Sequence, residues 1–289
     1  MSEPALRTTA FGDRLTKAVD TFGPLCVGID PHAQLLEAWG LSDDVDGLRR
    51  FAEISVEAFA GQVAIVKPQS AFFERHGSAG VAVLEEVLAG LREAGTLSLL
   101  DVKRGDIGST MTAYADAYLS DRSPLRADAI TVSPYLGFGS LQPTIELAQA
   151  TGRGLFVLAM TSNPEGASVQ HAVRDGVSVA ESMISGVAKL NAGEPSRIGS
   201  FGLVVGATTG KDLADLGLTA ALTESRAPLL APGVGAQGAT IEDVRRGFGE
   251  AERQVLPATS RDVLSAGPDP AALRARCQSV VEEAAALQR

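Results

Sequence analysis

Cysteine, histidine and tryptophan are scarce in this 289-residue sequence, and their scarcity excludes several kinds of site. The two cysteines, Cys26 and Cys277, lie near opposite ends of the chain, without the short spacing of a zinc site or a disulfide framework. Cys26 lies in an apolar run, where a thiol behaves as a small hydrophobic side chain. The three histidines, His32, His76 and His171, form neither a catalytic triad nor a metal-binding pattern. We therefore expect no metal site.

Long hydrophobic runs and excess positive charge are also absent. No apolar run approaches the roughly 20 residues that a membrane-spanning helix needs, and segment 1–15 lacks the apolar core of a secretory signal peptide. A cytoplasmic location is therefore expected. Lys and Arg number 25 against 35 Asp and Glu, a net charge of −10. Because duplex binding depends on clustered Lys and Arg, nucleic acid is not the expected partner. Without a long apolar run, a membrane is not expected either. An anionic small-molecule substrate would need a locally positive pocket.

What the sequence does contain is a regular alternation of short apolar runs with longer amphipathic segments, which predicts βα units and a parallel sheet. The expected strands are 25–29, 63–66, 97–100, 129–132, 155–159, 202–205, 229–230 and 254–256. Eight such units in fewer than 300 residues are typical of a (β/α)8 TIM barrel, here a single domain over 1–289. An open doubly wound sheet is the alternative, but the first run ends without the usual G-x-G-x-x-G turn.

Segments of helical period lie between these runs, at 46–59, 81–93, 112–120, 178–190 and 271–287. The stretch 167–192 follows the fifth run and contains no proline. We expect a helical insertion around 167–192, either as an extra helix or as a decorated loop on the barrel.

Polar or ionisable residues recur at the C-terminal end of nearly every expected strand, where the active sites of such barrels lie. The densest group is Asp101, Lys103 and Asp106, within 99–110. On a strand, Asp101 and Lys103 at i and i+2 project to the same face. Neighbouring carboxylates keep an ammonium protonated, so Lys103 is expected to be a proton donor rather than a Schiff-base nucleophile. An ordinary salt-bridge network at a strand end is the alternative. Lys67 also ends a strand at the barrel mouth.

The loop after the seventh expected strand is glycine-rich. Gly233, Gly235 and Gly238 would leave backbone N–H groups unobstructed, and a helix that starts shortly afterwards adds its positive end. Arg261, after the eighth strand, supplies a forked donor. Together with Gln237 these residues predict a phosphate site, because the last two loops are the usual phosphate site of this barrel. The alternative is that the glycines serve only as turns.

The motif Asp101-x-Lys103-x-x-Asp106-Ile107, followed by Thr110, resembles the signature of the orotidine 5′-phosphate decarboxylase family. The amino-acid sequence of 99–110 is similar to that of the longer bacterial (type 2) subgroup of this family. Further matching segments, in the same order and at strand ends, are 27–31, 66–68, 161–164, 230–238 and 260–261. The resemblance covers almost the whole chain.

This resemblance implies a lyase that converts orotidine 5′-phosphate (OMP) to UMP, the last step of de novo pyrimidine synthesis, without a cofactor. Lys103 would protonate C6 of the pyrimidine as carbon dioxide leaves, with Asp101 beside the departing carboxylate. Asp106, Ile107 and Thr110 would reach into the neighbouring subunit's site, so that a homodimer shares its active sites. No pyridoxal phosphate lysine motif or metal site is visible to act as an electron sink, so a fixed cation would have to stabilise the developing carbanion.

The resemblance also implies how the substrate is held. Asp30 would bind the ribose hydroxyls, Lys67 would link the charged network to the ribose, and Ser162 would contact the amide edge of the pyrimidine. The residues expected at the 5′-phosphate are Gln237, Arg261 and the loop residues Pro232, Gly233, Val234 and Gly235. Asn163 stands where some shorter relatives carry histidine, so its role stays open.

Two other functions remain possible from the residues alone. A Mg2+-dependent sugar-phosphate aldolase or decarboxylase on the same barrel shares Asp-x-Lys-x-x-Asp, but usually has a further acid after the second strand. Here that strand end is Lys67-Pro68-Gln69, with no acid before Glu74. A non-catalytic barrel that binds a phosphate ligand is the other alternative, although such a protein has no use for the cluster around Lys103.

Overall fold

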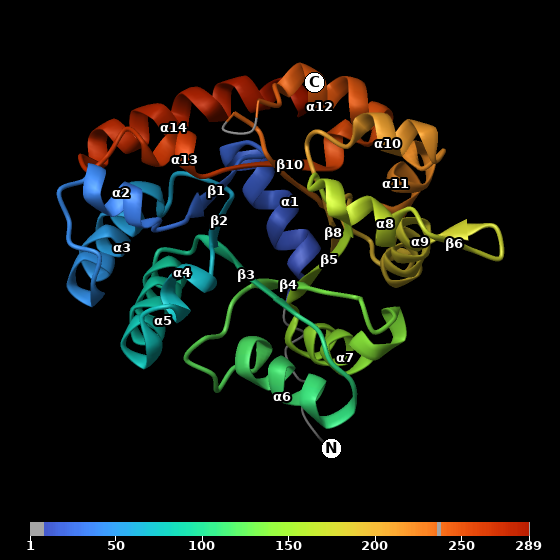
Figure 1. Ribbon diagram of the computed structural model, residues 1–289, viewed down its shortest axis with the longest axis horizontal. Coiled ribbons are helices and arrows are strands. Elements are labelled where there is room, and N and C mark those ends of the chain that lie inside the picture. The colour runs from blue at the N-terminus through green and yellow to red at the C-terminus, as the bar shows by residue number, and fades with distance from the viewer. Residues whose placement is uncertain (1–8, 236–237, 289) are drawn as a thin grey trace.

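Eight parallel strands close into a barrel in the computed structural model, which describes residues 9–235 and 238–288. Around the barrel the order is β1, β2, β3, β4, β5, β8, β9 and β10, and β10 pairs with β1. Their bounds are β1 (Cys26–Ile29), β2 (Ile65–Pro68), β3 (Leu97–Arg104), β4 (Ala129–Val132), β5 (Gly154–Met160), β8 (Phe201–Val205), β9 (Leu229–Pro232) and β10 (Val255–Thr259). The predicted (β/α)8 barrel is confirmed, with helices arranged around the strands (Figure 1).

Helices of very different lengths connect the strands. They are α1 (Phe11–Phe22), α2 (Ala33–Ala38), α3 (Val45–Phe59), α4 (Ala71–Glu74), α5 (Gly77–Glu93), α6 (Gly108–Leu119), α7 (Gln142–Thr151), α8 (Ala167–Gln170), α9 (Val179–Asn191), α10 (Gly210–Asp215), α11 (Thr219–Ser225), α12 (Ile241–Phe248), α13 (Arg261–Leu264) and α14 (Pro270–Ala284). The expected helical segments overlap α3, α5, α6, α9 and α14. Within the described ranges, no helix has both the length and the apolar content to cross a membrane.

Helix α1 was not among the expected helices, yet it closes one end of the barrel. Phe11, Leu15 and Val19 recur at helical spacing and are buried. They pack against side chains from the barrel interior, including Ile65 of β2 and Leu99 of β3. In Figure 1, α1 crosses the middle of the ring of strands. The N-terminal end of the barrel is therefore filled by packing, and the opposite end is left for a site.

The segment 167–192, expected as a helical insertion, is a short helix, a hairpin and a longer helix. After α8, the two-residue strands β6 (Val173–Arg174) and β7 (Val177–Ser178) pair antiparallel before α9 begins. Asp175 and Gly176 both have positive φ, 55° and 82°, which is the requirement of a tight Asp-Gly hairpin turn. The hairpin projects from the rim of the barrel (Figure 1). Asp-Gly was the sequence signal for this interruption.

Candidate active site

Strand β3 extends four residues beyond its expected end, and Asp101 and Lys103 lie in this extension. Its pairing with β4 shifts register between Leu100 and Arg104, and Lys103 has a φ of 47°. A left-handed conformation at a residue other than glycine costs about 1–3 kcal/mol and is typical of functional sites. The Lys103 N–H donates to Thr131 Oγ1 of β4 at 2.9 Å, which helps to hold this backbone. The bulge aims the Lys103 side chain back at Asp101.

Asp101 is the centre of a network of hydrogen bonds and ion pairs. Its Oδ1 accepts from Lys103 Nζ at 2.6 Å and from Thr131 Oγ1 at 2.7 Å. Its Oδ2 accepts from Gln69 Nε2 at 2.8 Å and from Lys67 Nζ at 3.3 Å. Burial by itself would raise the pKa of Asp101, but the two ammonium groups and these hydrogen bonds outweigh it and lower the pKa to about 2. Asp101 is therefore a carboxylate at neutral pH.

Lys67 connects Asp101 to the end of β1. Its Nζ lies 3.3 Å from Asp101 Oδ2 and 3.8 Å from Asp30 Oδ1, and the side chain is only 8% exposed. Burial would lower the pKa of Lys67, but the carboxylates of Asp30 and Asp101 reverse this effect and hold the pKa above its ordinary value. Ser260 Oγ, after β10, donates to Asp30 Oδ2 at 2.6 Å. Four alternating charges, Asp30, Lys67, Asp101 and Lys103, thus form one chain of contacts across three strand ends. We call this chain the charge network.

Glycine at position 28 is required by this arrangement. A Cβ added to Gly28 would lie 2.0 Å from Ser260 Oγ and 3.2 Å from Asp30 Oδ1. Any larger residue would therefore displace the hydroxyl that orients Asp30. The close approach of β1 to the loop after β10 depends on the missing side chain.

The low pKa of Asp101 has a consequence for stability. Because the pKa is lower in the folded chain than the ordinary 3.8, ionisation of Asp101 stabilises the fold fully above about pH 4, and this contribution is lost as the pH falls towards 2. We expect the stability advantage of the wild-type protein over Asp101→Asn to shrink by about 2 kcal/mol between pH 5 and pH 2. Urea unfolding of both proteins across this range measures the difference. A difference that does not vary with pH would contradict the assigned interactions.

Asp106 does not join the charge network of its own chain. Its Oδ1 accepts from the Ile107 N–H at 2.8 Å, and it forms no ion pair with any residue in the described ranges. Ile107 is 62% exposed, and Thr110 is exposed on the first turn of α6. Of the two acids expected to flank Lys103, only Asp101 contacts it. Ile107 and Thr110 are exposed at the edge of the barrel mouth, and Asp106 beside them is half-buried.

The loops after β3 and β4 touch each other beside these residues. The Ser133 N–H donates to Arg104 O at 2.8 Å, and a Cβ at Gly105 would lie 2.2 Å from Ser133 O. Tyr135 and Leu136, two and three residues after Ser133, are 79% and 53% exposed. With Ile107 they form an exposed apolar surface next to the charge network, which we call the mouth-edge surface (Ile107, Tyr135 and Leu136). Large exposed apolar groups gathered in this way are typical of protein–protein contacts.

The expected phosphate site lies across the barrel from β3, after β9 and β10. Pro232 ends β9, and Gly233, Gly235 and Gly238 have φ of 106°, 76° and 86°. The Gly235 N–H donates to Ala239 O and the Gly238 N–H to Gly235 O, both at 2.9 Å. Two of the three glycine N–H groups are therefore used in hydrogen bonds within the loop. Gln237 lies outside the described residues.

Arg261 begins α13, directly after β10. It is exposed, and its guanidinium makes no hydrogen bond or ion pair with any residue that the structure describes. The charge of Arg261 also acts on His32, which follows β1. Burial lowers the pKa of His32, and the nearby charges of Arg261 and Arg75 lower it further. Arg261 is thus a cation held close to the ends of β1 and β10 with its donors available to an anion.

Ser162 lies in the loop after β5 and is exposed. A Cβ at Gly206, in the loop after β8, would lie 3.2 Å from the Ser162 backbone nitrogen. The β5 and β8 loops are therefore in close contact, and Ser162 occupies the rim between the charge network and the phosphate loop.

Three residues of the site were missed in the sequence: Gln69, Thr131 and Ser260. Thr131 is the one polar residue of β4, in Ala-Ile-Thr-Val, and a buried hydroxyl in an apolar strand needs a partner. Gln69 follows Lys67 by two positions, so that both side chains share one face. These patterns were visible, but only the structure shows that the partner of Gln69 and Thr131 is Asp101.

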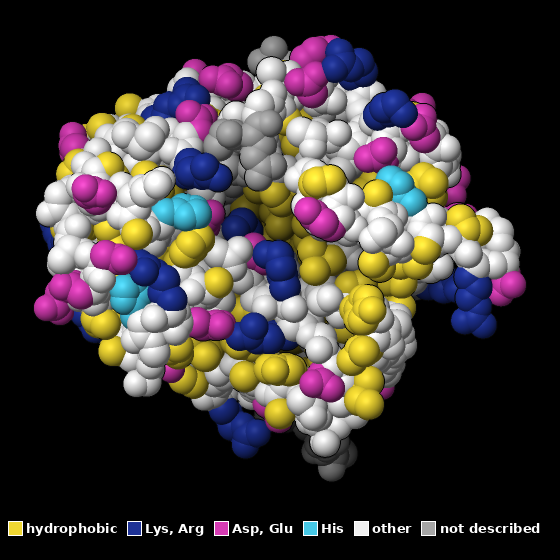
Figure 2. All heavy atoms as spheres, viewed as in Figure 1, with side chains coloured by type: hydrophobic (Ala, Val, Ile, Leu, Met, Phe, Trp, Pro, Cys, Tyr) yellow, Lys and Arg dark blue, Asp and Glu magenta, His cyan; other side chains and the backbone are white. Residues whose placement is uncertain are grey.

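The barrel face that carries these residues is hollowed. In Figure 2 a depression at its centre contains Lys or Arg and Asp or Glu side chains close together. A cavity of about 350 Å³ borders the charge network and is lined in part by Gln69, Asp101, Lys103 and Arg104. Its size is within the range of small-molecule sites.

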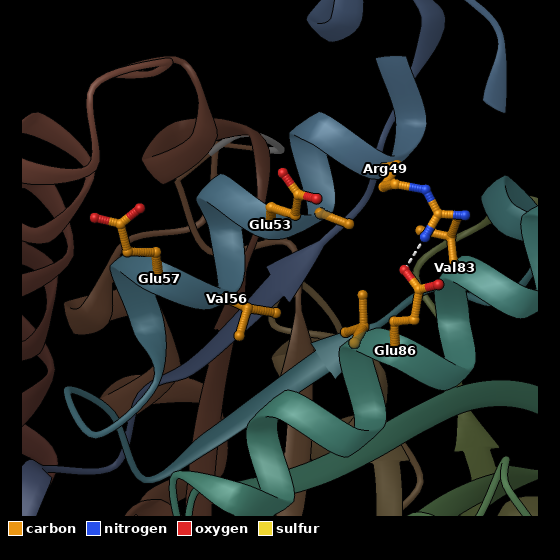
Figure 3. Close-up of a pocket in the computed structure, with 8 residues that line it drawn as sticks. Arg49, Glu53, Val56, Glu57, Val83 and Glu86 are labelled. Carbon is orange, nitrogen blue, oxygen red and sulfur yellow. Dashed lines mark hydrogen bonds and ion pairs between the residues drawn. The ribbon is translucent and has the colours of Figure 1, made fainter. Parts of the chain in front are cut away.

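A separate groove of about 340 Å³ lies between α3 and α5, far from the charge network. Val56 and Val83 point into it, and the ion pair of Arg49 with Glu86 crosses one end (Figure 3). None of the predicted site residues lines this groove, so it is not the active site.

Comparison with known proteins shows which family this chain resembles along most of its length. Residues 23–276 match the model of the orotidine 5′-phosphate decarboxylase / HUMPS family. The orotidine 5′-phosphate decarboxylase of Streptomyces coelicolor is 60% identical over 267 residues, which cover 91% of this chain and 93% of that protein. The decarboxylase of Salinispora arenicola is 59% identical over 275 residues, covering 95% and 96%. The crystal structure of Leishmania donovani OMP decarboxylase superposes with a TM-score of 0.74 at 31% identity, covering 97% and 99%.

Proposed function

Because the chain belongs to the orotidine 5′-phosphate decarboxylase / HUMPS family, we propose that its charge network performs the chemistry of that decarboxylase. The chain is a carboxy-lyase that converts OMP to UMP, as its relatives at about 60% identity are named. The observation that carries the assignment of roles is the contact of Lys103 Nζ with Asp101 at 2.6 Å, at the C-terminal end of a barrel strand.

Lys103 is the proton donor in this proposal. When the bond between C6 and the carboxylate breaks, its electron pair stays on C6 and carbon dioxide leaves. An ammonium held beside C6 stabilises this charge as it develops and then gives one proton to C6. UMP is formed with a neutral lysine, which regains a proton from solvent. Thr131 and the left-handed backbone at Lys103 support this role, because they fix the position of the amine before the substrate arrives.

Asp101 lies beside the substrate carboxylate in the same proposal. Its pKa of about 2 keeps it negative at neutral pH, so the two carboxylates repel each other until carbon dioxide leaves. This repulsion raises the energy of the bound substrate relative to the transition state. Asp101 also holds Lys103 and Lys67 in place through direct contacts.

The remaining site residues bind the rest of the nucleotide. Asp30 and Lys67 contact the ribose hydroxyls, and Ser162 contacts the pyrimidine amide. Arg261 binds the 5′-phosphate, supported by its exposed guanidinium, together with Gln237 and the loop residues Pro232, Gly233, Val234 and Gly235. Binding energy from the phosphate, which does not react, can then be used for catalysis at C6.

A homodimer completes the site. Asp106 forms no ion pair with Lys103 of its own chain, and Ile107, Tyr135 and Leu136 expose apolar surface near it. A second copy placed on the mouth-edge surface would bury these side chains and bring Asp106, Ile107 and Thr110 towards the partner's charge network. We also propose that the enzyme acts in the cytoplasm without a cofactor.

The alternative is a Mg2+-dependent sugar-phosphate enzyme of the same family. Such an enzyme needs an acid near the end of β2, and the candidate is Glu74. Its Oε1 accepts from Ser70 Oγ and from Arg104 Nη2, both at 2.6 Å, while Gln69 occupies the position next to Asp101. These contacts favour the decarboxylase over the Mg2+-dependent activity.

The direct test follows the ultraviolet absorbance of OMP with purified protein, with and without EDTA. Loss of the OMP signal that EDTA does not change supports the proposal. Absence of turnover, or EDTA-sensitive activity on a pentulose or hexulose phosphate instead of OMP, would overturn it.

Replacing Arg261 tests the phosphate site. In Arg261→Ala we expect KM for OMP to rise about 100-fold, because a forked, charge-assisted contact is lost, and kcat to fall as well, because phosphate binding supports catalysis. Steady-state kinetics measure both. The control is Arg174→Ala on the β6–β7 hairpin, a side chain that is 94% exposed. Unchanged kinetics in Arg261→Ala would exclude Arg261 from the site.

A further inference from the structure

A second cavity lies at the N-terminal end of the barrel, on the face opposite the active site. It has a volume of about 530 Å³ and lies between α1 and the turn that connects α5 to β3. Leu97, at the start of β3, lines it, whereas Lys103 is near the other end of the same strand. A strand of this length spans about 25 Å. The cavity is therefore separate from the charge network, and none of the residues predicted for OMP lines it.

Three cationic side chains line this cavity, against one carboxylate. They are Arg14 and Lys17 of α1 and Arg92 of α5, with Asp128 before β4. Asp128 is already occupied: its Oδ1 pairs with Arg14, and its Oδ2 accepts from the Ser98 N–H and Oγ at 2.9 and 3.1 Å. This leaves positive charge facing the cavity in a chain whose net charge is −10.

The individual cations have few partners in the protein. Lys17 and Arg92 form no ion pair with any residue in 9–235 or 238–288, and the Arg92 guanidinium donates a long hydrogen bond to Leu88 O at 3.4 Å. Burial, and then the charge of Arg126, lower the pKa of Arg92, while the carboxylates of Asp128 and Glu93 act in the opposite direction. Arg14 is fixed by Asp128 and by Gly152 O at 3.0 Å, so its position is set before any ligand binds. An anion in the cavity would be attracted by all three of these groups.

Part of the remaining wall is apolar. Phe22 and Leu97 line the cavity next to the cations. An inorganic anion would leave this surface unused, whereas a phosphate ester with an aromatic group would cover it. The volume is within the range of sites that enclose small organic ligands.

We propose that this cavity binds a nucleoside polyphosphate, with Arg14, Lys17 and Arg92 on the phosphates and the apolar wall of Phe22 and Leu97 against the base. The negative charge of two or more phosphate groups is complementary to the three cations from two helices. The aromatic base would cover the apolar wall. The proposal does not depend on the decarboxylase assignment, because it uses neither the residues nor the face of that site.

The test uses the full-length protein and isothermal titration with ATP, with inorganic tripolyphosphate as a probe that lacks the base. We expect ATP to bind, and to bind more tightly than tripolyphosphate. In the double variant Lys17→Gln, Arg92→Gln the ATP affinity should fall about 10-fold or more, because two charged contacts are lost. The matched control is Arg174→Gln, Lys189→Gln, which removes the same charge from exposed positions and should leave the affinity unchanged.

Two further measurements keep the outcome unambiguous. The double variant should retain the wild-type kcat and KM for OMP, and this result would show that it is folded. If the double variant does not fold, each single variant is tested in its place. ATP binding should also persist in Arg261→Ala, which distinguishes this cavity from the active site. The proposal is overturned if wild-type protein does not bind ATP, if the double variant binds it equally well, if tripolyphosphate binds as tightly as ATP, or if Arg261→Ala abolishes binding.

Discussion

Replacing Lys103 with alanine is expected to abolish OMP turnover while UMP still binds. Lys103 Nζ lies 2.6 Å from Asp101 at the end of β3, and no other ammonium in the described residues contacts both Asp101 and the exposed part of the mouth. Lys67, the other lysine of the network, is 8% exposed against 46% for Lys103. Lys103 is therefore the lysine that we place next to C6 of a bound nucleotide.

The loss should be very large, because one side chain supplies two effects. A positioned general acid contributes about 10²–10⁴-fold, and a fixed charge at a developing anion about 10²–10³-fold. We expect kcat to fall by about 10⁴-fold or more in Lys103→Ala. Stopped assays over long incubation measure the residual rate, and equilibrium titration measures UMP binding.

The control for this variant is Lys189→Ala, an exposed lysine on α9 that should leave kcat unchanged. Retention of UMP binding by Lys103→Ala would show that the site remains assembled. A variant that keeps more than about 1% of wild-type kcat would contradict the assignment of Lys103, because general-acid catalysis alone exceeds that factor.

Mixing two inactive variants is expected to restore activity if the active site is shared. Asp101→Ala damages the charge network of its own chain, whereas Asp106→Ala removes a residue that we place in the partner's site. A mixed dimer then contains one site with neither change and one site with both. With random exchange of subunits, half of the dimers are mixed and half of their sites are intact, so about a quarter of wild-type activity should return.

The matched control mixes Asp101→Ala with Lys103→Ala. Both residues belong to the same charge network, 2.6 Å apart, so every site in the mixed dimer carries one of the changes and no activity should return. Activity in the first mixture alone would establish that Asp106 acts in the neighbouring site. If neither mixture recovered activity after verified exchange, Asp106 would be assigned to its own chain.

The mouth-edge surface provides the physical reason to expect that two subunits associate at the active site. Ile107 and Tyr135 are large apolar side chains with exposures of 62% and 79%, next to a charged site. A partner that covers them removes apolar surface from water, at about 25 cal/mol per Å². The same partner would exclude water from the charge network, which strengthens its electrostatic interactions.

The positions of the eight barrel strands could be predicted from the sequence, because each is a short run of buried residues between segments of helical period. β4 and β8 are buried at every position, so an apolar run and a strand coincide. The insertion was harder to predict. Residues 167–192 contain no proline, and we expected them to be helical. Asp175 and Gly176 instead adopt positive φ and turn the chain into a hairpin. A local turn of two residues overrides a weak helical pattern.

Residues of the site could be predicted where the chemistry is carried by charge. Asp30, Lys67, Asp101 and Lys103 were expected at strand ends, and the structure joins them through contacts of 2.6 to 3.8 Å. The neutral partners of this network could not be predicted in the same way. Thr131 and Gln69 have ordinary roles in strands and loops, and only their approach to Asp101 distinguishes them.

The sequence by itself determined which groups are available: an Asp-x-Lys-x-x-Asp motif at the end of a strand, an arginine at the end of the last strand, and a chain that alternates strands with helices. The tertiary structure decided how those groups are used. Closing of the barrel brings Lys67 between Asp30 and Asp101, and the bulge in β3 turns Lys103 onto Asp101, whereas Asp106 stays outside this network. The physical reason is that residue types follow from local sequence, whereas ion-pair distances depend on register and closure between strands that are far apart in the chain.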